Sequence, residues 1–360
     1  MNRTIAIVHN AVTDPARPDE ADVLVQVAAV TSALNGLGYH PVPVPCTLDL
    51  AALKQALETI RPSGVFNLVE SLENRGSLIH VVPALLDALA VPYTGCPATA
   101  VYATSHKVMA KERLHLAGLP TPAWINPFPV DMLWQGGMDL REDRPAGTKS
   151  NGNKHPQNSS APQNQDIERV WIIKSVWEHG SVGLEAEHLL TGTAKTVNRL
   201  LKARATGLGG ACFAEQFIFG REFNLSLLAD RSGVQVLPAA EILFPDTPNS
   251  RPAMVGFRAK WEQDSEEYHN TPRRFDFSPA DTPLLAELNT LARRCWHLFH
   301  LAGYARVDFR VDSDGRPFIL EINTNPCLSP DAGFAAALDR AKIPYAEAVH
   351  QMVTTQLCSE

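Results

Sequence analysis

Apolar and polar positions follow two different periods along the first part of the chain. Short apolar runs, which are typical of buried strands, alternate with longer stretches whose apolar residues recur at helical spacing. We predict strands at 4–8, 40–45 and 65–69, and helices at 20–37, 49–60 and from Gly76 to about Ala90. Strands that alternate with helices favour a wound parallel sheet, and this part of the chain should end near residue 96.

The rest of the chain gives a second, less regular set of elements. Residues 97–117 have a helical pattern, Gly118 is suited to cap that helix, and the prolines of 119–122 require extended chain. Beyond them we predict helices at 191–204 and about 279–301, and strands at 170–176, 211–218, 222–229, 234–243, 254–261, 304–311 and 316–323.

One polar segment interrupts this pattern. In residues 144–165 only two alanines are apolar, and Pro, Asn, Gln, Ser, Gly and Lys fill most of the remaining positions. Such a segment buries too little apolar surface to offset the entropy lost on ordering. We therefore predict a disordered insertion at about 138–167 and give it no catalytic role.

Composition narrows the class of protein. A chain of 360 residues is long enough for two or three lobes. A net charge of −7 offers no basic excess for nucleic acid, and no apolar stretch approaches the roughly 18 residues of a membrane span. The first apolar run is too short for a secretory signal. Six cysteines without a CxxC pair or a histidine cluster favour free thiols over a zinc site, so we expect a cytoplasmic protein.

The strongest chemical signal lies in the last two predicted strands. If they pair around a turn at 312–315, Arg306 faces Glu321 and Asp308 faces Ile319. Side chains alternate along a strand, so one face would be apolar, with Val307, Phe309, Val311, Phe318, Leu320 and Ile322. The other face would be polar, with Arg306, Asp308, Arg310, Glu321 and Asn323.

The polar face is a candidate metal site. Asp308 and Glu321 would be diagonal neighbours, roughly 7–8 Å apart between backbones, and the amide of Asn323 would lie on the same face. Two carboxylates and an amide oxygen suit Mg²⁺ that also holds nucleotide phosphates. A solvated face with an Arg–Glu pair is the alternative. The polar residues 323–326, which directly continue a buried strand, favour a site.

At this hairpin the sequence resembles a known family. RVDF at 306–309 and LEINTNP at 320–326 resemble the magnesium motif of ATP-grasp enzymes, and most closely that of D-alanine–D-alanine ligases. Further strings are similar to the same family in the same order: FNLVE, ALLDALAVPYTG, HKVMAKERLHLAGLPTP, WIIKSVWEHGSVGL and EQFIFGREFNLSLL. The similarity extends over most of the chain outside 130–168.

The resemblance implies a fold and its division. An α/β ATP-grasp fold has three lobes, the first a wound parallel sheet. The lobes here would be an N-terminal α/β lobe at 1–96, a central ATP-grasp subdomain at 97–218, and a C-terminal subdomain with the metal site at 219–360.

The resemblance also implies site residues for ATP and for Mg²⁺ or Mn²⁺. Arg306 would stabilise an oxyanion, and the metal ligands would be Asp308, Glu321 and Asn323. The nucleotide would be held by Lys107, Lys174, Gly180, Ser181, Glu215, Phe217, Ile218 and Glu222. In this list the lysines reach phosphates, the loop with Gly180 covers them, the hinge at 215–218 holds adenine and Glu222 holds ribose. Taken alone, these residues are equally compatible with surface lysines, an ordinary turn and a core strand.

The implied reaction is ATP-dependent ligation of a carboxylate to an amine through an acyl phosphate, with release of ADP and phosphate. The family's substrate-orienting residues differ here. Gly180 and Trp261 stand where the family has Ser and Tyr, Glu20 is a weak match to its Glu, and Cys327 replaces a glycine. We therefore expect other small-molecule substrates, which we take to be amino acids, with Arg75, Lys260, Trp261 and Cys327 near them.

Two alternatives remain open from the sequence. One is a genuine D-alanine–D-alanine ligase of peptidoglycan synthesis that tolerates these changes. The other is a non-catalytic ATP-binding regulator, which would have lost metal ligands or Arg306, and these are intact. Members of the family are commonly dimers, so a homodimer is one expected state. We expect neither nucleic acid nor a membrane as a partner.

Overall fold

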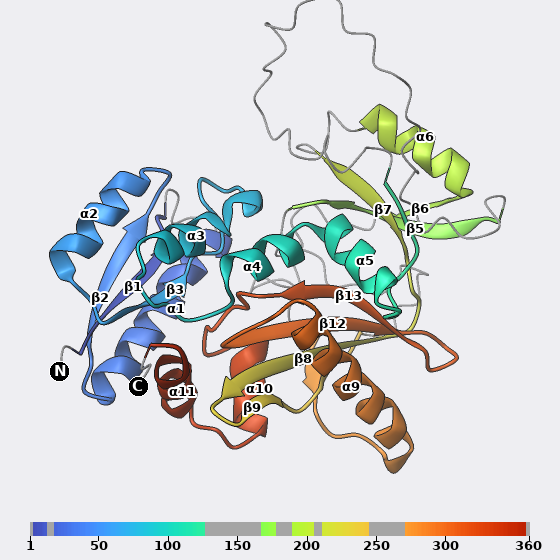
Figure 1. Cartoon of the computed structure of the whole chain (residues 1–360). Coiled ribbons are helices and arrows are strands. Elements are labelled where there is room, and N and C mark those ends of the chain that lie inside the picture. The colour runs from blue at the N-terminus through green and yellow to red at the C-terminus, as the bar shows by residue number, and fades with distance from the viewer. Residues whose placement is uncertain are drawn as a thin grey trace, which may run out of the picture.

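The computed structural model describes residues 3–12, 18–126, 167–177, 189–204, 211–244 and 271–357, and within these ranges the chain forms three sheets (Figure 1). The predicted insertion, apart from Ile167, and the predicted strand at 254–261 lie outside the described residues. No helix in the described ranges is long and apolar enough to cross a membrane.

The first sheet is parallel, as the alternating pattern predicted. Its strand order is β2 (His40–Cys46), β1 (Thr4–Asn10), β3 (Gly64–Leu68). The accompanying helices are α1 (Pro18–Gly36), α2 (Leu50–Ile60), the short η1 (Gly76–Leu78) and α3 (Val81–Ala88). The central strand β1 is buried from Ile5 to His9, and the first four of these residues are its apolar run.

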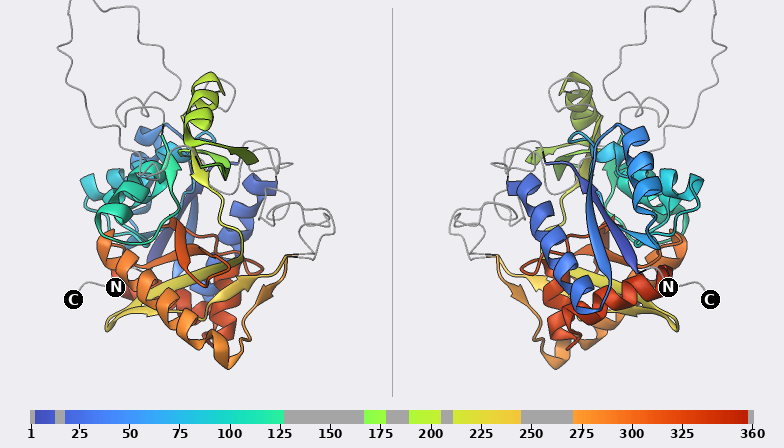
Figure 2. Two further views of the ribbon diagram at one scale, coloured as in Figure 1. Left: turned by 90° about the vertical axis from the view of Figure 1, so that its right-hand side faces the viewer. Right: turned by 90° about the vertical axis from the view of Figure 1, so that its left-hand side faces the viewer.

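The second sheet is small and antiparallel. Its order is β4 (Trp124–Ile125), β7 (Cys212–Gln216), β5 (Arg169–Ser175), β6 (Leu189–Gly192). Helix α6 (Ala194–Arg204) packs Val197 and Leu201 against Trp171 and Ile173 on one face. This sheet and α6 stand together at one end of the molecule in both views of Figure 2.

The third sheet is the largest and carries the hairpin. Its order is β11 (Arg273–Arg274), β10 (Ala240–Ile242), β8 (Arg221–Asp230), β12 (Tyr304–Val311), β13 (Pro317–Asn323), and β9 (Gly233–Val236) also pairs with β8. The predicted strand at 234–243 is wrong as a single element, because the chain leaves the ladder between β9 and β10 around Pro238, which has no N–H to donate.

Helices cover the large sheet on both faces. On its apolar face, α4 (Ala98–Ser105), α5 (Lys107–Leu116) and α9 (Thr282–Leu298), which follows the short η5 (Pro279–Asp281), form the largest core with β8, β12 and β13. Near one end of the other face, α10 (Gly333–Arg340) and α11 (Tyr345–Gln356) pack with α1 and β1 around Tyr304. The first and third sheets therefore share a core, and the limits 1–96, 97–218 and 219–360 stay predictions.

The predicted continuous helix at 97–117 is wrong, because the chain breaks at His106. This residue is extended (φ −80°, ψ 91°) between α4 and α5. Its ring atom Nδ1 accepts a hydrogen bond of 3.0 Å from the Met109 N–H and so caps α5. The Lys107 N–H donates to Val176 O just beyond β5 (3.0 Å). The break therefore puts Lys107 in the first turn of α5, at the end of the strand that carries Lys174.

Helix α5 lies between the second and third sheets (Figure 1). Its residue Val108 packs with Trp124 and Phe213 of the small sheet. Its residues Ala110 and Leu114 belong to the core of the large sheet. One helix thus supports both sheets.

Candidate active site

The hairpin register differs from the prediction. Asp308 faces Glu321 directly and Arg306 faces Asn323, so the predicted pairs Arg306–Glu321 and Asp308–Ile319 are wrong. The register then shifts, and Phe309 pairs with Ile319, which leaves Leu320 as an extra residue in β13. A β-bulge of this kind adds one residue to one strand, and alternation in the sequence does not reveal it.

The bulge changes which side chains reach each face. Ile319 and Ile322 are buried in the core with Val307, Phe309 and Val311. Phe318 and Leu320, which were expected in that core, are only half-buried. Directly facing residues have backbones about 4.5–5.5 Å apart, so Asp308 and Glu321 lie closer together than predicted.

Arg306 and Asp308 form a paired contact on β12. Arg306 donates from Nε to Asp308 Oδ1 (2.7 Å) and from Nη2 to Oδ2 (2.9 Å). Asn224 on β8 donates to the same Oδ1 (2.8 Å). Burial acts to lower the pKa of Arg306, but the Asp308 carboxylate raises it above its ordinary value. The guanidinium is therefore charged and held in a fixed orientation.

Glu321 and Asn323 extend this polar face along β13. Glu321 Oε1 lies 3.9 Å from Lys107 Nζ at the start of α5. Asn323 Oδ1 accepts from the Asn325 N–H (3.0 Å), which leaves this oxygen a second lone pair. Asn325 in turn donates to Val69 O beyond β3 (2.9 Å), so the end of β13 is tied to the first sheet.

These oxygens fit the metal that the family uses. Asp308, Glu321 and Asn323 offer two carboxylates and an amide, which are hard ligands of the kind Mg²⁺ takes. In the described part of the chain no three His, Cys, Asp or Glu side chains gather as a metal site. An ion held here would therefore complete its coordination with non-protein oxygens such as phosphate or water.

The segment after β7 has two buried apolar side chains and an ordered main chain. Phe217 and Ile218 are both buried. The N–H of Gln216 donates to Ala123 O (2.8 Å) and that of Phe217 to Val170 O (2.9 Å). The main-chain N–H groups at 216 and 217 are therefore used within the small sheet, so a main-chain N–H that donates to a ligand would have to come from Ile218 or beyond.

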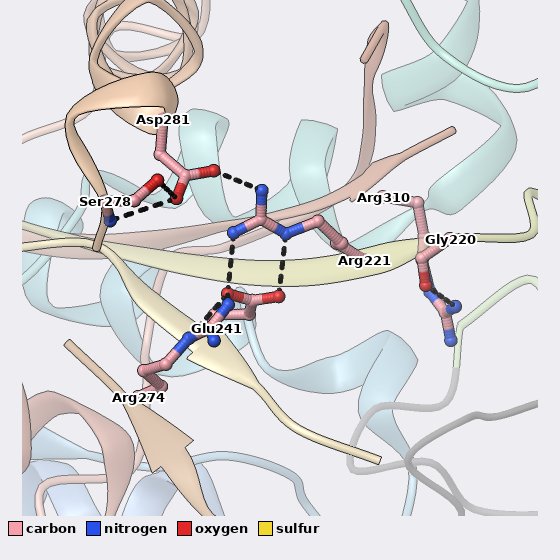
Figure 3. Close-up of polar contacts among 7 residues, drawn as sticks. All are labelled: Gly220, Arg221, Glu241, Arg274, Ser278, Asp281 and Arg310. Atoms are coloured by element: carbon pink, nitrogen blue, oxygen red, sulfur yellow. Dashed lines mark hydrogen bonds and ion pairs between the residues drawn. The ribbon is translucent and has the colours of Figure 1, made fainter. Parts of the chain in front are cut away.

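Glu222 and Arg310 connect this segment to the large sheet. Arg310 Nη2 lies 3.0 Å from Glu222 Oε2, and its guanidinium stands 5.2 Å from the centre of the Phe217 ring. Arg310 also donates from Nη1 to Gly220 O (3.3 Å), as Figure 3 shows. The turn between β7 and β8 is thereby fixed from the neighbouring strand β12.

Figure 3 also shows a second ionic network on the large sheet, around Glu241 on β10. Arg221 on β8 donates to both oxygens of Glu241 (2.8 Å each), and Arg274 on β11 donates from Nε to Oε2 (3.1 Å). Arg221 Nη1 also lies 2.5 Å from Asp281 Oδ1 before α9. The network joins three strands to the start of α9. Its member Arg221 directly precedes Glu222 in the sequence.

Lys174 shares its partner Glu215 with Lys111, a residue that the sequence did not single out. Lys174 Nζ lies 2.5 Å from Glu215 Oε1, and Lys111 Nζ lies 2.5 Å from Glu215 Oε2. Lys111 is on α5, four residues after Lys107, and residues at this spacing share a helix face. The spacing of four residues from Lys107 was the only hint in the sequence that Lys111 belongs to the site. It is a weak hint, because most lysines on helices are solvent-exposed.

The remaining predicted site residues fall into two groups. Gly180 and Ser181 of the predicted phosphate loop, and Lys260 and Trp261 of the predicted substrate site, lie outside the described residues. Arg75 is exposed at the start of η1, and its guanidinium makes no hydrogen bond or ion pair within the described ranges. Glu20 lies on α1. Among the described residues no hydrogen bond or ion pair joins Arg75 to the hairpin, so its role stays a prediction.

Cys327 takes part in a hydrogen-bonded group with α1. Its Sγ donates to Asp22 Oδ2 (3.1 Å), and Ser329 Oγ donates to Asp22 Oδ1 (2.6 Å). Gln26 bridges Asp22 (3.0 Å) and Glu70 (2.8 Å). Burial, and next the charges of Glu70 and Asp22, raise the pKa of Cys327 well above its ordinary value. The thiol is therefore a protonated donor and not a nucleophile.

The fold and the site together define an ATP-grasp ligase, an enzyme that uses ATP and Mg²⁺ to form a peptide-type carbon–nitrogen bond. Residues 147–354 match the family model described as D-ala D-ala ligase C-terminus, and the chain belongs to this family. The predicted ATP-grasp fold, the ligase class and the two cofactors are thereby confirmed.

Related sequences can be aligned with most of this chain. The D-alanine–D-alanine ligase of Moorella thermoacetica is 29% identical over 320 residues, which cover 87% of this chain and 88% of that protein. The D-alanine–D-alanine ligase of Methylococcus capsulatus is 29% identical over 329 residues, which cover 91% and 88%. An uncharacterised protein y4sG of Sinorhizobium fredii is 26% identical over 291 residues, which cover 81% and 74%.

Solved structures share the fold. The Bacillus anthracis D-alanine–D-alanine ligase complexed with ATP matches with a TM-score of 0.66 at 18% identity and covers 98% of this chain and 97% of its own. The Vibrio cholerae D-alanyl-alanine synthetase A matches with a TM-score of 0.67 at 13% identity and covers 99% of each chain.

Proposed function

We propose that this ATP-dependent carboxylate–amine ligase joins two amino acids, or a similar acid and amine, through an acyl phosphate. The observation that carries the proposal is the polar face of the hairpin. There Arg306 is locked to Asp308, Asp308 faces Glu321, and Lys107 approaches Glu321 from α5. This face groups cations and hard oxygen donors as phosphoryl transfer requires.

The reaction is balanced without a nucleophilic side chain. A carboxylate oxygen of the first substrate takes the terminal phosphoryl group of ATP, giving an acyl phosphate and ADP. The amine of the second substrate then attacks the acyl carbon, and phosphate leaves with the bonding electrons. The amine proton passes to phosphate or solvent. The Arg306 guanidinium, charged and held by Asp308, would stabilise the oxyanion formed at the acyl carbon.

Asp308, Glu321 and Asn323 would hold the divalent cation. Bound Mg²⁺ supplies positive charge beside the transferred phosphoryl group. The chain's own contribution is to keep these three oxygens on one face and Lys107 beside them. Asn224 and Arg306 keep the Asp308 carboxylate in one orientation.

The nucleotide would lie between the small and large sheets. Lys107 and Lys174 would contact phosphates, and Gly180 and Ser181 belong to the loop proposed to cover them. Phe217 and Ile218 would pack against adenine beside Glu215, with Glu222 at the ribose. In support, Lys107 is in the first turn of α5 beside the end of β5, and Phe217 and Glu222 both contact Arg310.

The residues that choose the substrates differ from those of D-alanine ligases. We propose that Arg75, Lys260, Trp261 and Cys327 line the acid and amine sites. The Cys327 thiol is held by Asp22, and Asp22 and Glu70 are bridged by Gln26. A cysteine in place of glycine adds a side chain beside the end of β13, which supports a change in the accepted acid.

A substrate panel tests the proposal. Purified protein is incubated with ATP, Mg²⁺ and pairs of D- and L-amino acids, and phosphate release and product mass are measured. Release that depends on two substrates, with an amide product 18 Da lighter than their sum because one water is lost, supports it. Release with D-alanine alone would instead support a D-alanine–D-alanine ligase, the activity that the names of the curated relatives favour. No release with any pair would contradict the proposal.

A further inference from the structure

Lys111 is a buried lysine that the proposed reaction does not use. It extends from α5 to Glu215 on β7, and Glu215 is shared with Lys174 on β5. The side chains of Lys111 and Glu215 are each 2% exposed, whereas that of Lys174 is 15% exposed. The three groups therefore form a buried row with Lys174 at its open end.

The charges of this row favour an anionic ligand. Two ammonium groups and one carboxylate give a net charge of +1. Because Lys111 balances the Glu215 carboxylate from the buried side, the charge of Lys174 is not fully offset. Without Lys111, Lys174 and Glu215 would form a neutral pair, and the whole Glu215 charge would act on Lys174, so less of the Lys174 charge would be left to attract a phosphate.

The row continues into the strand that carries Glu321. Lys111 Nζ donates to Thr121 Oγ1 (2.8 Å) and to Pro122 O (3.3 Å). Thr121 Oγ1 donates to Ile319 O (2.9 Å), and the Ile319 N–H donates to Pro120 O (2.9 Å). Ile319 precedes the bulged Leu320, so these bonds fix β13 at the point where its register shifts.

Hydrogen bonds and one ion pair, between Lys111 and Glu215, thus connect the proposed phosphate contact to the proposed metal strand. From the small sheet they run through Lys174, Glu215, Lys111 and Thr121 to the main chain of β13. The packing of α5 against both sheets runs beside them. Lys111 is the central member, because it contacts both Glu215 of the small sheet and Thr121, which bonds to β13.

We propose that Lys111 is a positioning residue for the nucleotide, which balances Glu215 so that Lys174 is available to phosphate and which holds the small sheet in register with β13. This inference rests on the proposed nucleotide site. It assigns Lys111 no contact with substrate or with reacting atoms.

The test compares Lys111→Met, Thr121→Val and the control Lys195→Met. Lys195 is exposed on α6, the helix that packs against the small sheet. We expect Lys111→Met to raise KM for ATP at least about tenfold, since removing one member of a buried charged group costs more than 1.4 kcal/mol. Thr121→Val should raise it about threefold, the effect of losing one hydrogen bond. KM for the acid and amine should stay within about twofold in both, and Lys195→Met should match the wild type.

A purely structural role would give another pattern. It would lower the melting temperature and the active fraction while KM for ATP stayed at the wild-type value, and that result would overturn the inference. If Lys111→Met does not fold, an unchanged KM for ATP in Thr121→Val overturns it equally. Calorimetric titration of each variant with Mg-ATP gives the same answer without turnover. A wild type that binds Mg-ATP but joins no substrates would sink the proposed function and leave this test intact.

Discussion

At the scale of single residues, the candidate site is built from charged side chains that pair with one another. Arg306 donates hydrogen bonds to Asp308 from two nitrogens, and Arg310 forms an ion pair with Glu222. Glu215 forms ion pairs with two lysines. Each contact limits the orientations open to a side chain before any ligand arrives. Preorganisation of this kind lowers the entropy lost when a charged ligand is bound.

The two hydrogen bonds from Arg306 to Asp308 give the first prediction. Arg306→Lys keeps the charge but cannot make both bonds to Asp308, so kcat should fall about 100-fold, in line with loss of a fixed oxyanion donor. KM for ATP should change little. Arg316→Lys in the turn of the same hairpin, which is 67% exposed, is the control. Steady-state kinetics with the best pair from the substrate panel measure both. A kcat within about threefold of wild type would rule out this role for Arg306.

The buried Lys111 gives a prediction about pH. Burial, only partly offset by Glu215, lowers the pKa of Lys111 from 10.5 to about 8. Between these values the unfolded chain holds one more proton than the folded chain, so stability rises with pH across this window. The free energy of unfolding of the wild type, minus that of Lys111→Met, should therefore rise by on the order of 3 kcal/mol from pH 8 to 10.5. Urea titrations at several pH values measure it, and a flat difference would contradict it.

At the scale of elements, the sequence located most helices and strands but not their interruptions. The parallel sheet, the two final strands and the strand β5, which carries Lys174, follow from apolar runs. The break at His106 does not, because both flanking segments keep helical spacing and the residue that stops one helix caps the next. The bulge at Leu320 does not follow from the sequence pattern either. The hydrogen bonds that fix it join Ile319 to Pro120 and Thr121, about 200 residues away in sequence. Long-range partners decide both features.

The cap at His106 gives the next prediction. His106→Ala and His106→Asn both remove the ring that packs edge-on against Trp177 (4.5 Å between ring centres). Only Asn keeps an acceptor for the Met109 N–H. The alanine variant should therefore unfold about 1 kcal/mol more easily than the asparagine variant, which is the worth of an N-cap. Urea denaturation with equal m-values tests this, and equal stabilities of the two variants would refute the capping role.

At the scale of the whole molecule, two shared supports link the three sheets. Helix α5 packs between the small and large sheets, and the core around Tyr304 joins the first sheet to α10 and α11. Tyr304 donates to Asn325 Oδ1 (3.1 Å), close to the end of β13. A ligand that bridges the sheets should therefore stabilise the molecule as a whole.

Ligand-linked stability gives the corresponding prediction. Mg-ATP at about 100 times its Kd should add about 2.7 kcal/mol, on the order of 5 °C in Tm. Asp308→Asn should remove most of the part that requires Mg²⁺, since an amide offers a cation less charge. Asp314→Asn, at the turn of the same hairpin and 66% exposed, should keep it. Thermal scans with ATP, with and without Mg²⁺, measure the difference. Equal Mg²⁺ effects in the two variants would exclude Asp308 as a ligand.

The turn at Gly220 has a consequence for which sequences this fold can accept. A Cβ there would stand 2.0 Å from Val311 O, whereas at Gly233, with nearly the same backbone (φ +136° against +137°), it would meet nothing within 4 Å. Both positions penalise side chains through φ, but only Gly220 adds a collision with another strand. In a saturation library selected for activity, position 220 should return glycine alone, whereas position 233, where only φ opposes a side chain, should also return some small residues. The difference in tolerance between the two glycines would measure how closely β12 approaches the turn that joins the two halves of the proposed nucleotide site.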